Sequence, residues 1–230
     1  DLLLGALART LADWTGQQRV VLDLEGHGRE SQWDDMDVSR TVGWFTCQYP
    51  FALDIDPGED AWDIARRVHM TLASVPQGGL GYGLVRYSRQ DRDEHAAGLR
   101  ALPDPQVRFN YLGQVTATDA DRGDVVADPG RAAFTLVQGG TGPTADPRAR
   151  RPYLLDVVAI VVDGRLQVSW IHCPQLHRQA TIESLSSGLL DRLRELCAEQ
   201  PTPGGLRPED FPLASLDHAQ LAAIEALLED

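Results

Sequence analysis

Residues 153–172 contain the pattern that most limits what this chain can fold into. Two apolar runs, 153–162 and 165–172, are separated only by Asp163-Gly164. This dipeptide between two apolar runs predicts a two-residue hairpin turn, so the runs are expected to pair as antiparallel strands. Both runs are apolar enough to be buried on two faces, which predicts that both strands lie in the centre of a sheet.

Three further segments, 19–25, 49–53 and 107–112, alternate between apolar and polar residues as strands do. In the first of them the aliphatic residues at alternate positions would face a core; they are Val20, Leu22 and Leu24. Glu25 would then lie at a strand end and point away from that core.

Apolar residues at helical spacing predict helices at 1–16, at 59–73 and from about 178, and residues 91–100 are expected to form a short polar helix. The apolar face of the first helix would consist of Leu4, Leu7, Leu11 and Trp14. Residues 76–87 contain four glycines within six residues, but their spacing is not the dinucleotide-binding fingerprint. We therefore expect closely packed irregular backbone there and no phosphate site.

Strands and helices are interleaved along the chain, so the predicted fold class is α/β, with a mixed sheet packed with helices around one core. Residues 1–200 would form this unit. Residues 201–230 would form a linker and a surface helix packed on the unit, with Asp217 and Gln220 in a capping box. The chain begins inside an apolar helical pattern and without Met, which indicates a piece of a longer protein.

The formal net charge of -13 argues against nucleic-acid binding and against an anionic membrane surface. Three cysteines that lie far apart indicate neither a disulfide framework nor a zinc site, and no metal site is expected. No apolar run is long enough to cross a membrane and no signal peptide is present, so a cytoplasmic setting is the expectation. Residues 148–151 form a local basic island, which is either a solvated loop or a contact for an acidic partner.

The segment Glu25-Gly26-His27-Gly28-Arg29-Glu30 places a carboxylate, an imidazole and a guanidinium within five residues at a strand end. The two glycines have no Cβ, so another group can approach the backbone closely there. If the extended backbone continues, His27 lies on the same side as Glu25. Taken alone, the segment is more typical of a turn whose charged groups pair with each other than of a catalytic site.

Several segments, taken in order, resemble motifs of the epimerization domains of nonribosomal peptide synthetases, which belong to the condensation-domain superfamily. The matching segments are 1–4, 25–30, 40–46 with 49–50, 76–83, 109–114 and 210–214. The resemblance extends from residue 1 to the tail. It implies the fold of the chloramphenicol-acetyltransferase-like condensation and epimerization domains.

The chain also departs from that family. Such domains are V-shaped with two lobes, and their active site lies in a tunnel between the lobes. The amino-terminal lobe carries two adjacent histidines, and no two histidines are adjacent here: the six are His27, His69, His95, His172, His177 and His218. The resemblance therefore implies the carboxy-terminal lobe only, with the amino-terminal lobe and the neighbouring synthetase modules as partners.

The resemblance implies an isomerase that converts an L-aminoacyl or peptidyl residue to its D form. The substrate is a thioester on the 4'-phosphopantetheine of a peptidyl carrier protein, and the domain binds no cofactor of its own. Inversion requires one group to remove the α-proton and another to return a proton on the opposite face. The resemblance implies that these groups are Glu25 and a histidine of the other lobe. A carboxyl group kept dry in a tunnel has a raised pKa, which suits this role.

Other motif residues have implied or open roles. Arg29 would orient Glu25 or stabilise the enolate, or else form an ion pair with Glu25 or Glu30. Asn110 and Tyr111 match family residues at the tunnel that can donate to the thioester oxygen, and strand alternation sends them to opposite faces, so only one of them is expected to point at substrate. The residues expected to shape the lobe or the tunnel are His27, Arg40, Trp44, Gly81, Tyr82 and Gln114; for Trp44 this means the core or the tunnel wall.

Two other functions stay open. The first is a condensation domain that forms peptide bonds, which shares the fold but usually lacks the segments found here at 25–30 and 109–114. The second is a noncatalytic module that only docks a carrier protein, for which the basic island at 148–151 would supply the positive surface. We expect this chain to be inactive without the histidine-bearing lobe.

Overall fold

The computed structural model describes residues 1–29, 37, 38, 40–87, 94–115, 146, 148–198 and 220. These residues form one five-stranded sheet with the strand order β2-β1-β3-β4-β5. The strands are β1 (Arg19–Gly26), β2 (Cys47–Asp54), β3 (Val107–Val115), β4 (Leu155–Val162) and β5 (Arg165–His172). The three inner strands are parallel to each other, and each edge strand is antiparallel to its neighbour. The predicted α/β class with a mixed sheet is confirmed.

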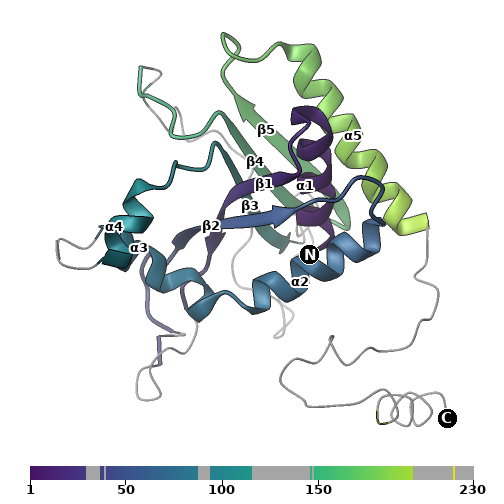
Figure 1. Ribbon diagram of the computed structural model, residues 1–230. Helices are drawn as coiled ribbons and strands as arrows, with labels where there is room; N and C mark the ends of the chain where they lie inside the picture. The colour runs from purple at the N-terminus through teal and green to yellow at the C-terminus, as the bar shows by residue number, and fades with distance from the viewer. Residues whose placement is uncertain are drawn as a thin grey trace, which may run out of the picture.

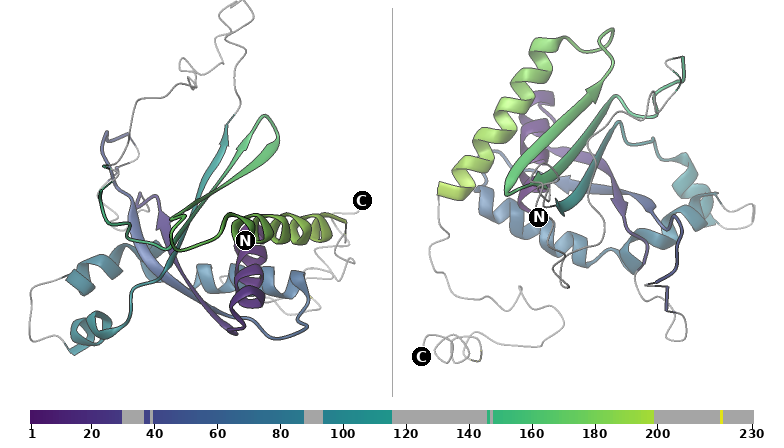
Figure 2. Two further views of the ribbon diagram at one scale, coloured as in Figure 1. Left: turned by 90° about the horizontal axis from the view of Figure 1, so that it is seen from above. Right: turned by 180° about the vertical axis from the view of Figure 1, so that it is seen from behind.

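Three helices cover one face of this sheet, namely α1 (Leu2–Thr15), α2 (Ala61–Ala73) and α5 (Gln179–Ala198) (Figure 1). The core lies between them and the sheet, and includes the buried side chains of Leu7, Leu22, Phe51, Val157 and Leu189. The remaining helices, η1 (Pro76–Gly79), α3 (Leu80–Tyr87) and α4 (Glu94–Ala101), lie together beyond one end of β2 (Figure 2). The opposite face of the sheet carries none of the helices in the described part of the chain.

The predicted hairpin is present, but its predicted position in the sheet is partly wrong. Asp163 and Gly164 both have positive φ, 49° and 74°, as a type I′ turn requires. However, β5 is an edge strand and β4 lies next to it. Side chains along β5 alternate between exposed and half-buried, because every second residue faces away from the helices. Three of the four outward positions of β5 are polar, namely Arg165, Gln167 and Ser169, and the fourth, Ile171, is 43% exposed.

Two further expectations need correction. Trp14 is 43% exposed, although Leu4, Leu7 and Leu11 are buried as predicted. The centre of its ring lies 6.0 Å from the centre of the His177 ring, so the side chain packs beside His177 and not in the core. Residues 80–87 form a helix where irregular backbone was expected. The irregular conformation is confined to η1, which carries non-helical dihedral angles.

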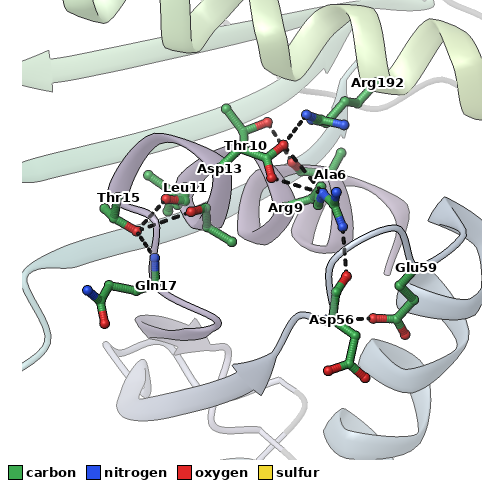
Figure 3. A network of polar contacts seen from close by, with 11 residues as sticks. Ala6, Arg9, Thr10, Leu11, Asp13, Thr15, Gln17, Asp56, Glu59 and Arg192 are labelled. Atoms are coloured by element: carbon green, nitrogen blue, oxygen red, sulfur yellow. Dashed lines mark hydrogen bonds and ion pairs between the residues drawn. The ribbon is translucent and has the colours of Figure 1, made fainter.

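A polar network joins α1 to two neighbouring segments (Figure 3). Arg9 donates to the backbone oxygen of Asp56 at 2.9 Å, which fixes the turn between β2 and α2. Asp13 accepts from Arg9 on the same helix and from Arg192 on α5. Glu59 completes the network by accepting from the backbone nitrogen of Asp56 at 3.1 Å. These contacts link α1 to α5 and to the turn that precedes α2.

Some predictions lie outside the described residues. These are residues 91–93 of the predicted short polar helix, and the linker and surface helix within 201–230 apart from Gln220, which include the segment 210–214. Within the described part of the chain, no helix combines the length and apolarity needed to span a bilayer.

The assignment of the two sheet faces predicts different costs for neighbouring substitutions on β1. Leu22 is 1% exposed, and its replacement by alanine is expected to lower the free energy of unfolding by about 2–5 kcal/mol, because it removes core contacts and leaves a cavity. Val21 is 39% exposed, so Val21→Ala should cost less than about 1 kcal/mol. Urea denaturation of both variants measures the difference, and equal costs would contradict the face assignment.

Candidate functional site

The register of the three inner strands builds a row of charged side chains on the face away from the helices. Asp23 on β1 pairs across the sheet with Arg108 on β3, and Arg108 pairs with Asp156 on β4. Glu25 follows Asp23 by two residues, so its side chain points to the same face. The backbone pairing thus places one arginine between carboxylates that are distant in sequence.

The Glu25 carboxylate is held by donors from two neighbouring strands. Its Oε1 accepts from Gln48 Nε2 at 3.0 Å and from Arg108 Nη1 at 2.9 Å. Its Oε2 accepts from Asn110 Nδ2. The Glu25 side chain is 15% exposed, so it is largely shielded yet still reachable at the surface of the sheet.

Arg108 is itself fixed by contacts on its other side. Its Nε donates to Asp156 Oδ1 at 3.0 Å and its Nη2 donates to Asp156 Oδ2, which is the bidentate arrangement that fits a carboxylate. Its guanidinium carbon lies 5.2 Å from the centre of the Tyr153 ring. The hydrogen bond with the Asp156 side chain raises the pKa of Arg108 above its ordinary value, so Arg108 is a permanent cation here.

Asp23 completes this group by accepting from the hydroxyl of Tyr153. Burial raises the pKa of the Asp23 carboxyl above its ordinary value, and neither the Tyr153 hydrogen bond nor the charge of Arg108 fully offsets the cost of desolvation. Burial likewise raises the pKa of the Tyr153 hydroxyl, and the hydrogen bond to Asp23 adds to this effect. We call these residues the Glu25 cluster: Asp23, Glu25, Gln48, Arg108, Asn110, Tyr153 and Asp156.

Arg29 lies outside this cluster and holds a neighbouring backbone segment. Its guanidinium donates to the carbonyl oxygens of Val38, Thr41 and Gly43 at 2.7, 2.9 and 3.1 Å. It also lies over the Phe45 ring, 4.4 Å from the ring centre. These contacts fix the segment that precedes β2. The alternative ion pair with Glu30 lies outside the described residues.

The extended backbone of β1 ends at Gly26, so His27 does not continue the alternation on the side of Glu25. His27 is exposed, and its Nδ1 accepts from the backbone nitrogen of Arg29 at 3.0 Å. Gly28 has a φ of 65°, and a Cβ placed there would lie 1.8 Å from the carbonyl oxygen of Phe45. Only glycine fits at this close approach of two backbone segments.

The segment 40–46 is more exposed than expected. Trp44 is 89% exposed, so its predicted position in the core is wrong, while a position in a tunnel wall stays a prediction. Arg40 is also exposed. The backbone of this segment is anchored by Arg29, which leaves the Trp44 side chain free of the core.

Asn110 and Tyr111 point to opposite faces of the sheet, as predicted. Asn110 reaches Glu25, whereas Tyr111 is 47% exposed and lines a hollow of about 520 Å³. Leu24, Glu25, Tyr49 and Phe109 also line this hollow. Gln114 is exposed near the end of β3, beyond an irregularity in the pairing with β4.

The predicted residues on α3 belong to a separate contact. Tyr82 accepts from Arg86 at 2.5 Å, and Arg86 also donates to Asp104 at 2.6 Å. Gly81 lies on the same helix and is half-buried. Gly79 has a φ of 87° and packs so tightly on Tyr49 that a Cβ there would lie 2.0 Å from its ring. This glycine segment shapes the packing of η1 on β2.

The structure brings together two of the predicted catalytic residues, Glu25 and Asn110. It adds Arg108, Asp156 and Gln48, which the sequence analysis missed. Alternation along 107–112 already placed Arg108 and Asn110 on one face, but the neighbouring strands were unknown without the sheet order. Among the described residues, no group of three or more histidine, cysteine or acidic side chains is placed to hold a metal ion.

Comparison with known proteins assigns the family. The condensation-domain family matches residues 1–203. The chain belongs to the condensation-domain family.

Curated relatives of this condensation-family chain are large proteins. One of the linear gramicidin synthase proteins of Brevibacillus parabrevis is 39% identical over 223 residues, which is 96% of the chain and 3% of that protein. Gramicidin S synthase 1 from Brevibacillus brevis is 30% identical over 236 residues, which covers the whole chain and 21% of that protein. The chain therefore spans only a small part of the relatives it matches.

Solved structures of the family share the fold. The epimerization domain from the third module of tyrocidine synthetase B is 34% identical, with a TM-score of 0.72 over 86% of this chain and 41% of that chain. A condensation domain for chain release from the enacyloxin polyketide synthase is 19% identical, with a TM-score of 0.55 over 89% of this chain and 37% of that chain. The second likeness shows the fold alone.

The raised pKa of Asp23 predicts how stability changes with pH. The folded chain binds the Asp23 proton more tightly than the unfolded chain, so this carboxyl favours the folded state most in acid and less as the pH rises above its ordinary pKa of 3.8. Asp23→Asn keeps an acceptor for Tyr153 and should raise the free energy of unfolding at pH 7, with a smaller gain near pH 4. Urea denaturation at both pH values measures this, and a gain that grows in acid would contradict it.

Proposed function

We propose that this chain is the carboxy-terminal lobe of an epimerization domain of a nonribosomal peptide synthetase, with Glu25 as one of its two proton-transfer groups. The observation that carries the proposal is the Glu25 carboxylate, which is largely shielded and held by donors from two neighbouring strands. A carboxylate that is held in place and still reachable can accept a proton, as the proposed general base must.

The comparisons support epimerization over condensation. The solved epimerization domain resembles this chain at 34% identity and a TM-score of 0.72, compared with 19% and 0.55 for the enacyloxin condensation domain. The curated relatives are named linear gramicidin synthase and gramicidin S synthase, which supports a place in a biosynthetic synthase. The family resemblance implies that segments 25–30 and 109–114 distinguish epimerization domains from condensation domains. In the structure these two segments are in contact through Glu25 and Asn110.

The proposed substrate is an aminoacyl or peptidyl thioester on the phosphopantetheine of a carrier protein. The thioester acidifies the α-proton, because the electron pair of the broken C–H bond spreads onto the carbonyl oxygen as an enolate. Glu25 takes this proton on one face. A histidine of the amino-terminal lobe gives a proton to the α-carbon on the other face, and exchange with solvent restores both groups.

The neighbouring residues have proposed supporting roles. Asn110 donates to Oε2 of Glu25, so its proposed role is to hold the base. Tyr111 borders the hollow that reaches Glu25, and we propose that it contacts the substrate from that side. Arg29 holds the backbone at Val38, Thr41 and Gly43, so its proposed effect on catalysis is to shape the surface beside Glu25. Trp44, which is 89% exposed, is proposed as tunnel wall against the other lobe.

Solvent-deuterium exchange at the α-carbon of a carrier-bound aminoacyl thioester tests the role of Glu25. The chain alone is expected to show no exchange, and a two-lobe domain that contains the chain is expected to show it. Glu25→Gln in that domain should lower the exchange rate by at least about 100-fold, because it removes a proton-transfer group. Glu183→Gln, at an exposed glutamate on α5, is the matched control and should leave the rate unchanged.

Three results would separate the alternatives. Exchange that survives Glu25→Gln removes the base role proposed for Glu25. Amide bond formation without α-carbon exchange identifies a condensation domain. Binding of the loaded carrier protein without either reaction identifies a docking module.

A further inference from the structure

The two oxygens of the Glu25 carboxylate have unequal surroundings. A carboxylate offers about four lone-pair positions to donors, two on each oxygen. Oε1 accepts from Gln48 and Arg108, at 3.0 and 2.9 Å. Oε2 accepts from Asn110 alone among the described residues. Oε1 is therefore saturated, and Oε2 keeps a lone pair for a substrate proton.

The donor that fixes Oε1 is held in place by a second carboxylate. Arg108 uses Nε and Nη2 on Asp156 and Nη1 on Glu25, so one planar guanidinium spans both acids. Its side chain is 26% exposed and lies against the ring of Tyr153. A lysine ammonium is a single point charge and does not reproduce this planar fork.

We propose that Arg108, anchored by Asp156, is a positioning residue that fixes Glu25 through Oε1 and leaves Oε2 as the proton-accepting atom. This inference rests on the proposed role of Glu25 as a base. The chain of contacts runs from Asp156 on β4, through Arg108 on β3, to Glu25 on β1. The base is thereby tied to the rigid centre of the sheet and not to the segment that follows β1. Misplacement of a reacting group by about 1 Å costs about 100-fold in rate, which is why such an anchor matters.

A purely structural role makes a different prediction. An ion pair that only joins β1, β3 and β4 would affect the free energy of unfolding, and the folded fraction of a variant would keep its full exchange rate. A positioning role lowers kcat for exchange in fully folded protein, while the KM for the loaded carrier protein stays within about twofold because the substrate is still bound.

The test uses a two-lobe domain that contains this chain, with deuterium exchange of a carrier-bound aminoacyl thioester as the readout. Arg108→Ala should lower kcat about 100-fold, and added methylguanidinium should restore part of it. Arg108→Lys should lower kcat about tenfold, because the charge remains but the fork to both carboxylates is lost. Asp156→Asn should also lower kcat, because it loosens the anchor. Arg165→Ala, at an exposed arginine beside the β4–β5 turn, is the control and should leave kcat unchanged.

The result that overturns the inference is a folded Arg108→Lys or Asp156→Asn domain with wild-type kcat while Glu25→Gln is inactive; the base role then stands without this anchor. If Glu25→Gln retains exchange, the proposed function itself fails. If Arg108→Ala does not fold, Arg108→Lys and Asp156→Asn decide, since each keeps a polar group in the cluster. Circular dichroism on every variant establishes the folded fraction.

Discussion

The parallel register of β1, β3 and β4 is the constraint on which the rest of the site depends. It sets Asp23, Arg108 and Asp156 side by side on the face that the helices leave open. A single cation among several carboxylates can form ion pairs with only some of them. Arg108 pairs with Asp156 and Glu25. Asp23 accepts a hydrogen bond from the Tyr153 hydroxyl, and desolvation raises the pKa of the Asp23 carboxyl. The electrostatics of the site therefore follow from strand pairing and not from the local sequence around Glu25.

The two faces of the sheet differ in polarity and in what they contribute to the protein. The face toward α1, α2 and α5 is apolar and carries the core that stabilises the chain. The other face carries the Glu25 cluster, whose charged side chains are buried at Asp23 and Asp156 and half-buried at Glu25 and Arg108. Partly buried ion pairs of this kind contribute little net stability, because desolvation offsets much of their attraction. The proposed role of the Arg108 ion pairs, which join β1, β3 and β4, is therefore to hold the Glu25 carboxylate in place.

Local patterns in the sequence predicted the elements well and their neighbours poorly. The helices at 1–16, at 59–73 and from about 178, the hairpin turn and the alternation of Leu22 and Leu24 against Glu25 depend on short-range periodicity, and these were confirmed. The central position of β5 was wrong, because burial depends on how many strands lie beside it. The same limit applies to the site. Alternation put Arg108 and Asn110 on one face, but only the order of the strands shows that this face also carries Glu25 and Asp156.

The two charged residues of the segment 25–30 that bracket its glycines are used in different ways, which the sequence spacing did not indicate. Glu25 is the last charged residue on β1 and is held by the sheet. Arg29 follows the positive φ of Gly28 and turns to the backbone that leads into β2. Gly28 makes this division possible, because any side chain there would collide with the Phe45 carbonyl and push the two segments apart. The segment thus fixes the carboxylate of Glu25, the proposed base, on one side and the backbone that leads into β2 on the other.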